Sequence, residues 1–113
     1  MTEDKRGAVR IDTLNLLYVG IYEERQLVKH AIGRTLNVSQ KGMLLEMHFP
    51  IETGQSVSLA IALEDDLVKI EGQVVYIRSG NDRKFEIGIE FLEMDEHVEE
   101  ILNKYIDAFK SQA

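Results

Sequence analysis

Two arginines stand four residues apart near the start of the chain, Arg6 and Arg10. A guanidinium group presents its donors in a planar fork. It can bind a phosphate or the Hoogsteen edge of guanine through two parallel hydrogen bonds, and it can stack on a base. The pair therefore suits a ligand that carries both guanines and phosphates. Taken alone, the same spacing is also typical of a solvated basic tail.

A second polar motif, residues 37–42, lies at the junction of two predicted strands. Asn37 and Ser39 offer short donors and acceptors that can bond a base edge or a ligand oxygen, and Gly42 permits either a positive-φ turn or a close backbone approach. An ordinary turn needs the same residue types, and that role is compatible with ligand binding. We expect this motif to be a rigid floor, over which the arginine segment becomes ordered.

The elements that must hold the second motif are mainly strands, because apolar residues recur at every second position. Six short strands are expected, over residues 14–22, 27–36, 43–49, 56–63, 68–76 and 84–92. Gly72 interrupts one apolar face and suggests a bulge or bend. The phenylalanines and Tyr76 alternate within strands and are expected to fill the interior.

The periodicity changes after Met94 to that of a helix with one apolar face, over about residues 95–110, with Asp95 as its N-cap. Strands followed by one helix favour an all-β fold: a six-stranded antiparallel β-barrel with one C-terminal α-helix, since closure removes exposed strand edges. We expect a flexible segment over residues 1–10, which carries the arginines, and a single barrel domain over residues 11–113.

Composition limits the function classes. The 113 residues have room for one core and include no cysteine, which suits a cytoplasmic protein. No apolar run approaches the roughly 18 residues of a membrane helix, so membrane insertion is not expected. A net charge of −7 argues against broad nucleic-acid binding. The three histidines, His30, His48 and His97, lack metal-site spacing, and no nucleophile arrangement is present, so neither a metal site nor an enzyme is expected.

Together the two motifs resemble the signature of the PilZ domain family, an RxxxR element followed by (D/N)xSxxG at the start of a barrel strand. Arg6 and Arg10 match the first element, and Asn37, Ser39 and Gly42 match the second. The strand-rich middle and the closing segment EIGIEFLEM, which leads into the helix, extend the resemblance over essentially the whole chain.

The resemblance implies a PilZ-like barrel of the split-barrel type that binds cyclic di-GMP, a bacterial second messenger. It implies that the arginines contact guanine and phosphate, and that Asn37 and Ser39 contact base and ligand from the barrel surface. Asn37 stands in place of the commoner aspartate, which removes a formal charge. The family supplies no catalytic residue, and no cofactor other than the ligand is implied.

Two functions are consistent with these features. The first is a cyclic di-GMP receptor that orders its arginine segment on binding and signals to a partner protein of unknown identity. The alternative is a protein-interaction scaffold that has the barrel and does not bind the nucleotide. A small barrel that binds single-stranded nucleic acid is disfavoured by the net charge and by the lack of interleaved aromatic and basic residues.

Overall fold

The computed structural model describes residues 11–12, 16–63 and 66–112 of the chain. Within these ranges most of the backbone is in strands, followed by a helix. The elements in chain order are β1 (Ile11–Asp12), β2 (Leu16–Glu23), β3 (Gln26–Val38), β4 (Gly42–Met47), β5 (Ser56–Leu63), β6 (Asp66–Ser79), β7 (Phe85–Phe91) and α1 (Glu96–Gln112).

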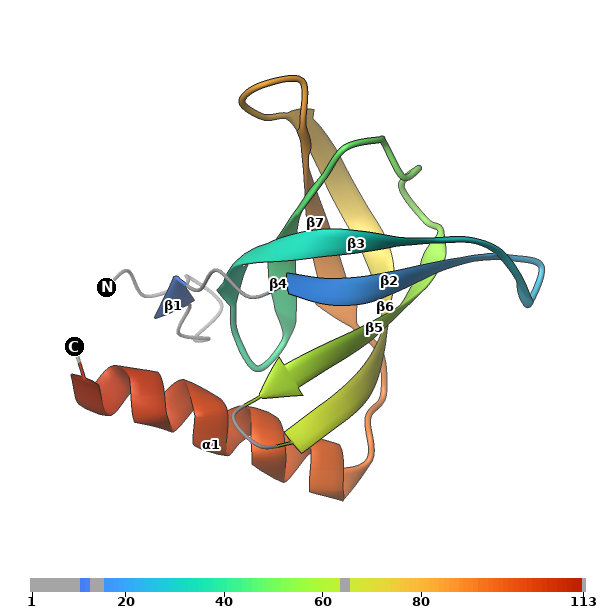
Figure 1. Ribbon diagram of the computed structural model, residues 1–113. Helices are drawn as coiled ribbons and strands as arrows, with labels where there is room; N and C mark the ends of the chain where they lie inside the picture. Colours follow the sequence, from blue (N-terminus) through green and yellow to red (C-terminus); the bar gives the residue numbers. More distant parts are fainter. Residues whose placement is uncertain (1–10, 13–15, 64–65, 113) are drawn as a thin grey trace.

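The strands close into an antiparallel barrel, shown in Figure 1. Neighbouring strands follow the order β3–β2–β5–β6–β7–β4, and a further pairing of β3 with β4 joins the two ends of this sheet. The two-residue strand β1 pairs with the end of β3, in line with β2. The expected fold, a six-stranded antiparallel barrel with a C-terminal helix, is confirmed, and β1 is an addition that the sequence did not predict.

Each barrel strand turns an apolar face inward. In β5, for example, Val57, Leu59 and Ile61 are buried in the core cluster, whereas the residues between them face outward. Helix α1 contributes Leu102 and Ile106 to the same cluster and packs against β1, β5 and β6. The helix therefore completes the core, and in Figure 1 it lies across the end of the barrel below β5 and β6.

The helix begins where the sequence predicts. The Asp95 carboxylate accepts a hydrogen bond from the His97 backbone N–H at 2.7 Å, and the Asp95 carbonyl accepts one from Glu99 N–H at 2.9 Å. Asp95 is thus the N-cap, and the acidic residues of the first turn complement the helix dipole. Over the residues that the structure describes, no helix is both long and apolar enough to span a membrane.

A β-bulge in β6 overturns one expectation about the core. The bulge is not at Gly72, where the register is regular, but between Val74 and Tyr76. Val74 is buried, and the extra residue Val75 shifts the alternation, so that Tyr76 points outward and is 41% exposed. The prediction that Tyr76 fills the barrel is therefore wrong. The phenylalanines of β7 and Phe49 are half-buried and pack against the core.

Candidate functional site

Ser39 holds the shape of the loop that joins β3 to β4. Its backbone N–H donates to the carbonyl of Gly42 at 2.8 Å, and its Oγ accepts from the Lys41 N–H at 3.2 Å. The hydroxyl also lies 3.4 Å from the Gly42 carbonyl, to which it donates, and the side chain is buried. The loop is therefore a rigid turn built by its own residues, as the sequence suggested.

Gly42 is required by close backbone approach and not by turn conformation. Its φ is not positive, which removes one of the two expected reasons for a glycine. A Cβ at this position would lie 2.2 Å from the carbonyl oxygen of Ile89 on β7, and the next pairing, Phe91 N–H to Lys41 C=O, is 2.8 Å long. Any side chain here would push β4 and β7 apart.

Asn37 begins a row of residues that crosses four strands on the outer face of the barrel. A second bulge lies between Thr35 and Asn37, and Asn37 pairs with Leu44 of β4. Leu44 pairs with Gly88 of β7, which pairs with Tyr76 of β6. On each strand at least one residue next to the row belongs to the core cluster or packs against it, so the row faces outward. These neighbours are Val38 on β3, Met43 and Leu45 on β4, Ile87 and Ile89 on β7, and Ile77 on β6. We call Asn37, Leu44, Gly88 and Tyr76 the outer row.

The Tyr76 ring lies directly over Gly88. A Cβ built on Gly88 would be 2.2 Å from Tyr76 Cε1, so the absence of a side chain on β7 makes room for the ring. The Arg78 guanidinium lies 5.8 Å from the ring centroid, at the outer limit of a cation–π contact. An exposed, laterally supported aromatic ring of this kind is suited to stacking with a nucleobase.

A groove of about 790 Å³ opens beside the outer row. Its walls are residues 39–42, Val75 and Tyr76 of β6, residues 88–91 of β7, and Leu92, Glu93, Met94 and Glu99 toward α1. The volume falls in the range of small-ligand sites. The side-chain carbonyl of Gln40 is buried there without a hydrogen-bond partner among the described residues.

The described walls of the groove are acidic. Their charged residues are one lysine, Lys41, and three glutamates, Glu90, Glu93 and Glu99. An anionic ligand would therefore need cations from another segment of the chain. Arg6 and Arg10, the arginines expected to provide them, lie outside the described residues, so their place in the site stays a prediction.

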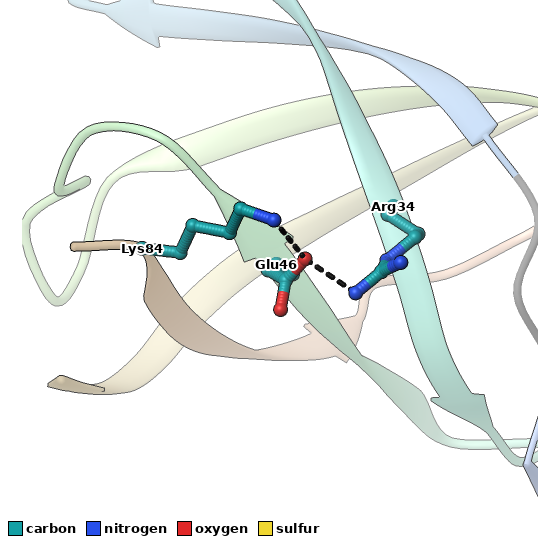
Figure 2. Close-up of polar contacts among 3 residues, drawn as sticks. All are labelled: Arg34, Glu46 and Lys84. Atoms are coloured by element: carbon teal, nitrogen blue, oxygen red, sulfur yellow. Dashed lines mark ion pairs between the residues drawn. The ribbon is translucent and has the colours of Figure 1, made fainter. Parts of the chain in front are cut away.

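A charged row runs parallel to the outer row, toward the β6–β7 hairpin. Glu46 of β4 pairs with Glu86 of β7 in register, and each carboxylate is flanked by an arginine. Glu46 contacts Arg34 at 2.7 Å and Lys84 at 3.5 Å, as Figure 2 shows. Arg78 binds Glu86 at 2.7 Å. The flanking cations offset the repulsion between two glutamates that directly face each other.

The hydrogen bond from Arg78 to Glu86, together with the attraction between their charges, raises the pKa of the Arg78 guanidinium above its ordinary value. Stability from a raised pKa is present below the ordinary value and is lost only as pH rises through the raised one. Both lie far above neutrality, so this pair adds no pH dependence near pH 7.

The structure thus brings Asn37, Ser39 and Gly42 together at one end of the outer face. Sequence reasoning missed Tyr76 and Gly88. The period of β7 already placed Gly88 on the outer face between two glutamates, and this was the available signal. In the described part of the chain, no group of three or more histidines and carboxylates could hold a metal ion.

Known proteins share this barrel. The family described as PilZ domain matches residues 4–108. No curated protein sequence matches the chain. The structure of the PilZ domain of YcgR from Escherichia coli with c-di-GMP is similar at a TM-score of 0.74 and 13% identity, over 96% of this chain and 94% of that one.

Two longer proteins contain a similar domain. Bacillus subtilis MotI/DgrA, an inhibitor of motility, matches at a TM-score of 0.72 and 20% identity, over 93% of this chain and 51% of that one. The K. pneumonia MrkH–c-di-GMP complex matches at a TM-score of 0.71 and 13% identity, over 91% of this chain and 50% of that one. The chain therefore spans about half the length of these two proteins, and at such identities the likeness shows the fold alone.

Proposed function

Because the chain belongs to the PilZ domain family, we propose that it is a receptor for cyclic di-GMP that signals to a partner protein and catalyses no reaction. The similar structures of YcgR and MrkH are complexes with c-di-GMP. The observation that carries the proposal is the outer row beside the groove, which has a polar amide at one end and an exposed aromatic ring, supported on Gly88, at the other.

The outer row matches the chemistry of a cyclic dinucleotide. A guanine stacks on the Tyr76 ring, and the Asn37 side chain offers an acceptor for guanine N–H donors. Three strand spacings of about 4.8 Å separate the ends of the row by about 14 Å. Leu44 is buried and Gly88 is covered by the Tyr76 ring, so the ring itself is the surface on which a flat ligand can lie.

The acidic walls of the groove make the proposed role of the N-terminal arginines more specific. Cyclic di-GMP carries two phosphates, and Lys41 is outnumbered by the glutamates of the groove. We expect Arg6 and Arg10 to supply the missing positive charge through bidentate hydrogen bonds to phosphate and guanine. In this proposal residues 1–10 become ordered over the barrel domain when the ligand binds, and the altered surface is read by the partner.

Titration calorimetry with cyclic di-GMP tests the proposal. We expect the full chain to bind, and Arg6→Ala and Arg10→Ala each to lose about 1.5–3 kcal/mol of binding free energy, since each removes a charged hydrogen bond. Backbone amide NMR should show shifts for residues 37–42 in the same titration. Lys69→Ala, which removes a cation remote from the groove, should bind like the wild type.

The acidity of the groove also favours a second candidate, the scaffold that does not bind the nucleotide. A well-dispersed NMR spectrum that does not change on addition of cyclic di-GMP would establish this alternative. If both arginine variants bound cyclic di-GMP with full affinity, the receptor proposal would stand, but the proposed role of Arg6 and Arg10 in binding would be rejected.

A further inference from the structure

A second surface of the barrel is apolar and uncovered. Leu16 and Tyr18 on β2 and Ile32 on β3 are 67%, 63% and 55% exposed. Tyr18 pairs with Ile32 on one side and with Ala60 of β5 on the other. Leu67 of β6, on the same outward face, is 76% exposed. We call these five residues the apolar face. Large side chains gathered on one outer sheet face mark an interaction site.

A small cavity adjoins the apolar face. Its volume is about 330 Å³, and Leu16 and Ile32 line one side. Arg34, Lys84 and His48 also line it, and Arg34 and Lys84 contact the carboxylate of Glu46. Both basic side chains approach the same oxygen of Glu46 (Figure 2), and Arg34 Nε has no hydrogen-bond partner among the described residues. Two cations share one carboxylate, so the cavity retains an excess of positive charge.

The opposite edge of the apolar face is also cationic. Lys69 pairs with Ala60 and therefore stands in the same outward row as Tyr18 and Ile32. With Arg34 and Lys84 it places three cations around the face. The carboxylates beside them are that of Glu46, which Arg34 and Lys84 share, and that of Glu71, two residues from Lys69 on the same side of β6, so the cations are in excess. This is a local reversal of charge on a chain whose net charge is −7.

From this pairing of exposed apolar side chains with a cationic rim, we propose that the apolar face docks a segment of a partner protein that carries apolar side chains flanked by carboxylates. The apolar side chains would cover Leu16, Tyr18 and Ile32. The carboxylates would complete the pairing of Arg34, Lys84 and Lys69, which is the charge complementarity expected of a protein interface.

Two other occupants fit less well. A second copy of the chain packed face to face would bring one cationic rim against another, because a two-fold interface joins two copies of the same patch. An anionic lipid surface would be approached by a molecule with net charge −7 through three cations, and each basic residue contributes only about 1 kcal/mol at such a surface. A protein segment can fill the cavity as well as cover the face.

The apolar face is separate from the proposed ligand site. The groove and the small cavity share no lining residue, and the cavity is lined by Arg34 and Glu46 of the charged row, which is one row away from the outer row. The proposal is therefore independent of cyclic di-GMP binding, and its test uses no nucleotide.

The test is an amide NMR titration of the isotope-labelled full chain with a synthetic helical peptide that has leucines on one face and glutamates beside them. The matched probe has lysine in place of every glutamate. We expect the acidic peptide to shift the signals of Tyr18, Ile32 and Lys69 and the basic peptide to leave them unchanged. Ile32→Ser and Lys69→Glu should each weaken the acidic peptide at least about tenfold, the equivalent of 1.4 kcal/mol.

Matched controls remove an exposed apolar residue and a lysine elsewhere. Val28→Ser on the β2–β3 hairpin and Lys104→Glu on α1 should bind the acidic peptide like the wild type. Equal binding of both peptides, or binding of neither, would overturn the proposal. So would binding of the chain to phosphatidylglycerol vesicles, or self-association in sedimentation velocity, if either were abolished by Ile32→Ser.

Discussion

Tyr76 and Gly88 act as one unit, because the tyrosine ring occupies the space that any side chain at position 88 would fill. Gly88→Ala should therefore displace the ring and reduce cyclic di-GMP affinity by about 1–3 kcal/mol, the usual value of one base–aromatic stack. Tyr76→Ala should lose a similar amount. The double variant should be no weaker than either single one, since both remove the same contact. Calorimetry measures all three.

Tyr18→Ala is the matched control for these variants. It removes a tyrosine of the apolar face that is 63% exposed, compared with 41% for Tyr76, and ligand affinity should not change. If Gly88→Ala bound cyclic di-GMP as tightly as the wild type, the ring over Gly88 would have no part in recognition.

Thr35 and Ser39 carry the two buried hydroxyls near the candidate site. Removal of the two hydroxyls should change the free energy of unfolding in opposite directions. The Thr35 hydroxyl is fully buried and has no hydrogen-bond partner among the described residues, so Thr35→Val should raise the free energy of unfolding, by about 1 kcal/mol. Ser39→Ala removes an acceptor of the Lys41 N–H and should lower it by about 0.5–1.5 kcal/mol. Urea unfolding at neutral pH measures both. A loss of stability in Thr35→Val would mean that the hydroxyl has a partner in solution.

At this scale the sequence identified the residues whose role is local. Ser39 could be found because a tight turn demands its chemistry from neighbours in sequence. Gly42 was found with it as part of the same motif, although it is required by the close approach of β7. Tyr76 could not, because its direction depends on one inserted residue, Val75, and period-two reasoning placed it in the core. A bulge is decided by pairing between strands, and a single strand's pattern does not contain that information.

Among the elements, the β2–β3 and β6–β7 hairpins have no glycine at the two central positions of their turns. Glu24 and Arg25 have φ values of 49° and 68°, and Asp82 and Arg83 have 54° and 63°. Positive φ at both central residues defines the type I′ turn, which matches the twist of a hairpin and favours glycine at its second position. These turns hold side chains in a backbone conformation that disfavours them.

Arg25→Gly and Arg83→Gly should each stabilise the fold. Relief of the left-handed conformation is worth roughly 1–2 kcal/mol, and glycine loses about 0.5–1 kcal/mol of that through chain entropy. The net gain is on the order of 0.5 kcal/mol each, and the gains should add because the turns are far apart in the barrel. Thermal unfolding of the double variant measures the sum. Gln26→Gly, one residue into β3, should destabilise instead, and a double variant no more stable than the wild type would show that the turns are unstrained.

The strands were predictable where one face of the strand is solvent-exposed and the other is buried. This holds for β5 and β7, whose bounds match the prediction within a residue or two. β3 runs from Gln26 to Val38, one residue before and two residues after the predicted range 27–36. Residues 26–30 are all exposed and show no alternation that would mark the start, and the bulge between Thr35 and Asn37 breaks the alternation near the end. β1 has two residues, too few to carry a pattern at all.

Over the whole molecule, charge is divided between surfaces. The groove beside the outer row is lined by glutamates, whereas the apolar face is rimmed by arginine and lysine. A net charge of −7 conceals this division, and from the net charge alone we predicted only that broad nucleic-acid binding is disfavoured. The receptor proposal places the basic site for the ligand in residues 1–10, so the ligand and the partner segment would be attracted by different cations.

Helix α1 connects the groove to the core, and ligand binding should therefore stabilise it. Glu99 and Met94 line the groove, while Leu102 and Ile106 are fully enclosed in the core cluster. A ligand that binds the folded barrel at a hundred times its Kd adds about 2.7 kcal/mol to the free energy of unfolding. Amides of α1 that exchange when the helix opens should therefore exchange more slowly in the presence of the ligand.

Hydrogen exchange followed by mass spectrometry, with and without cyclic di-GMP, measures this coupling. Peptides from the start of α1 and from residues 37–42 should slow together, whereas the β2–β3 hairpin tip, remote from the groove, should exchange as before. Ile106→Ala should loosen the helix at a cost of about 2–5 kcal/mol and also weaken ligand binding, because part of the binding energy would then be spent on docking the helix. Protection confined to residues 37–42, with ligand affinity unchanged in Ile106→Ala, would mean that the helix only completes the core and takes no part in the response to the ligand.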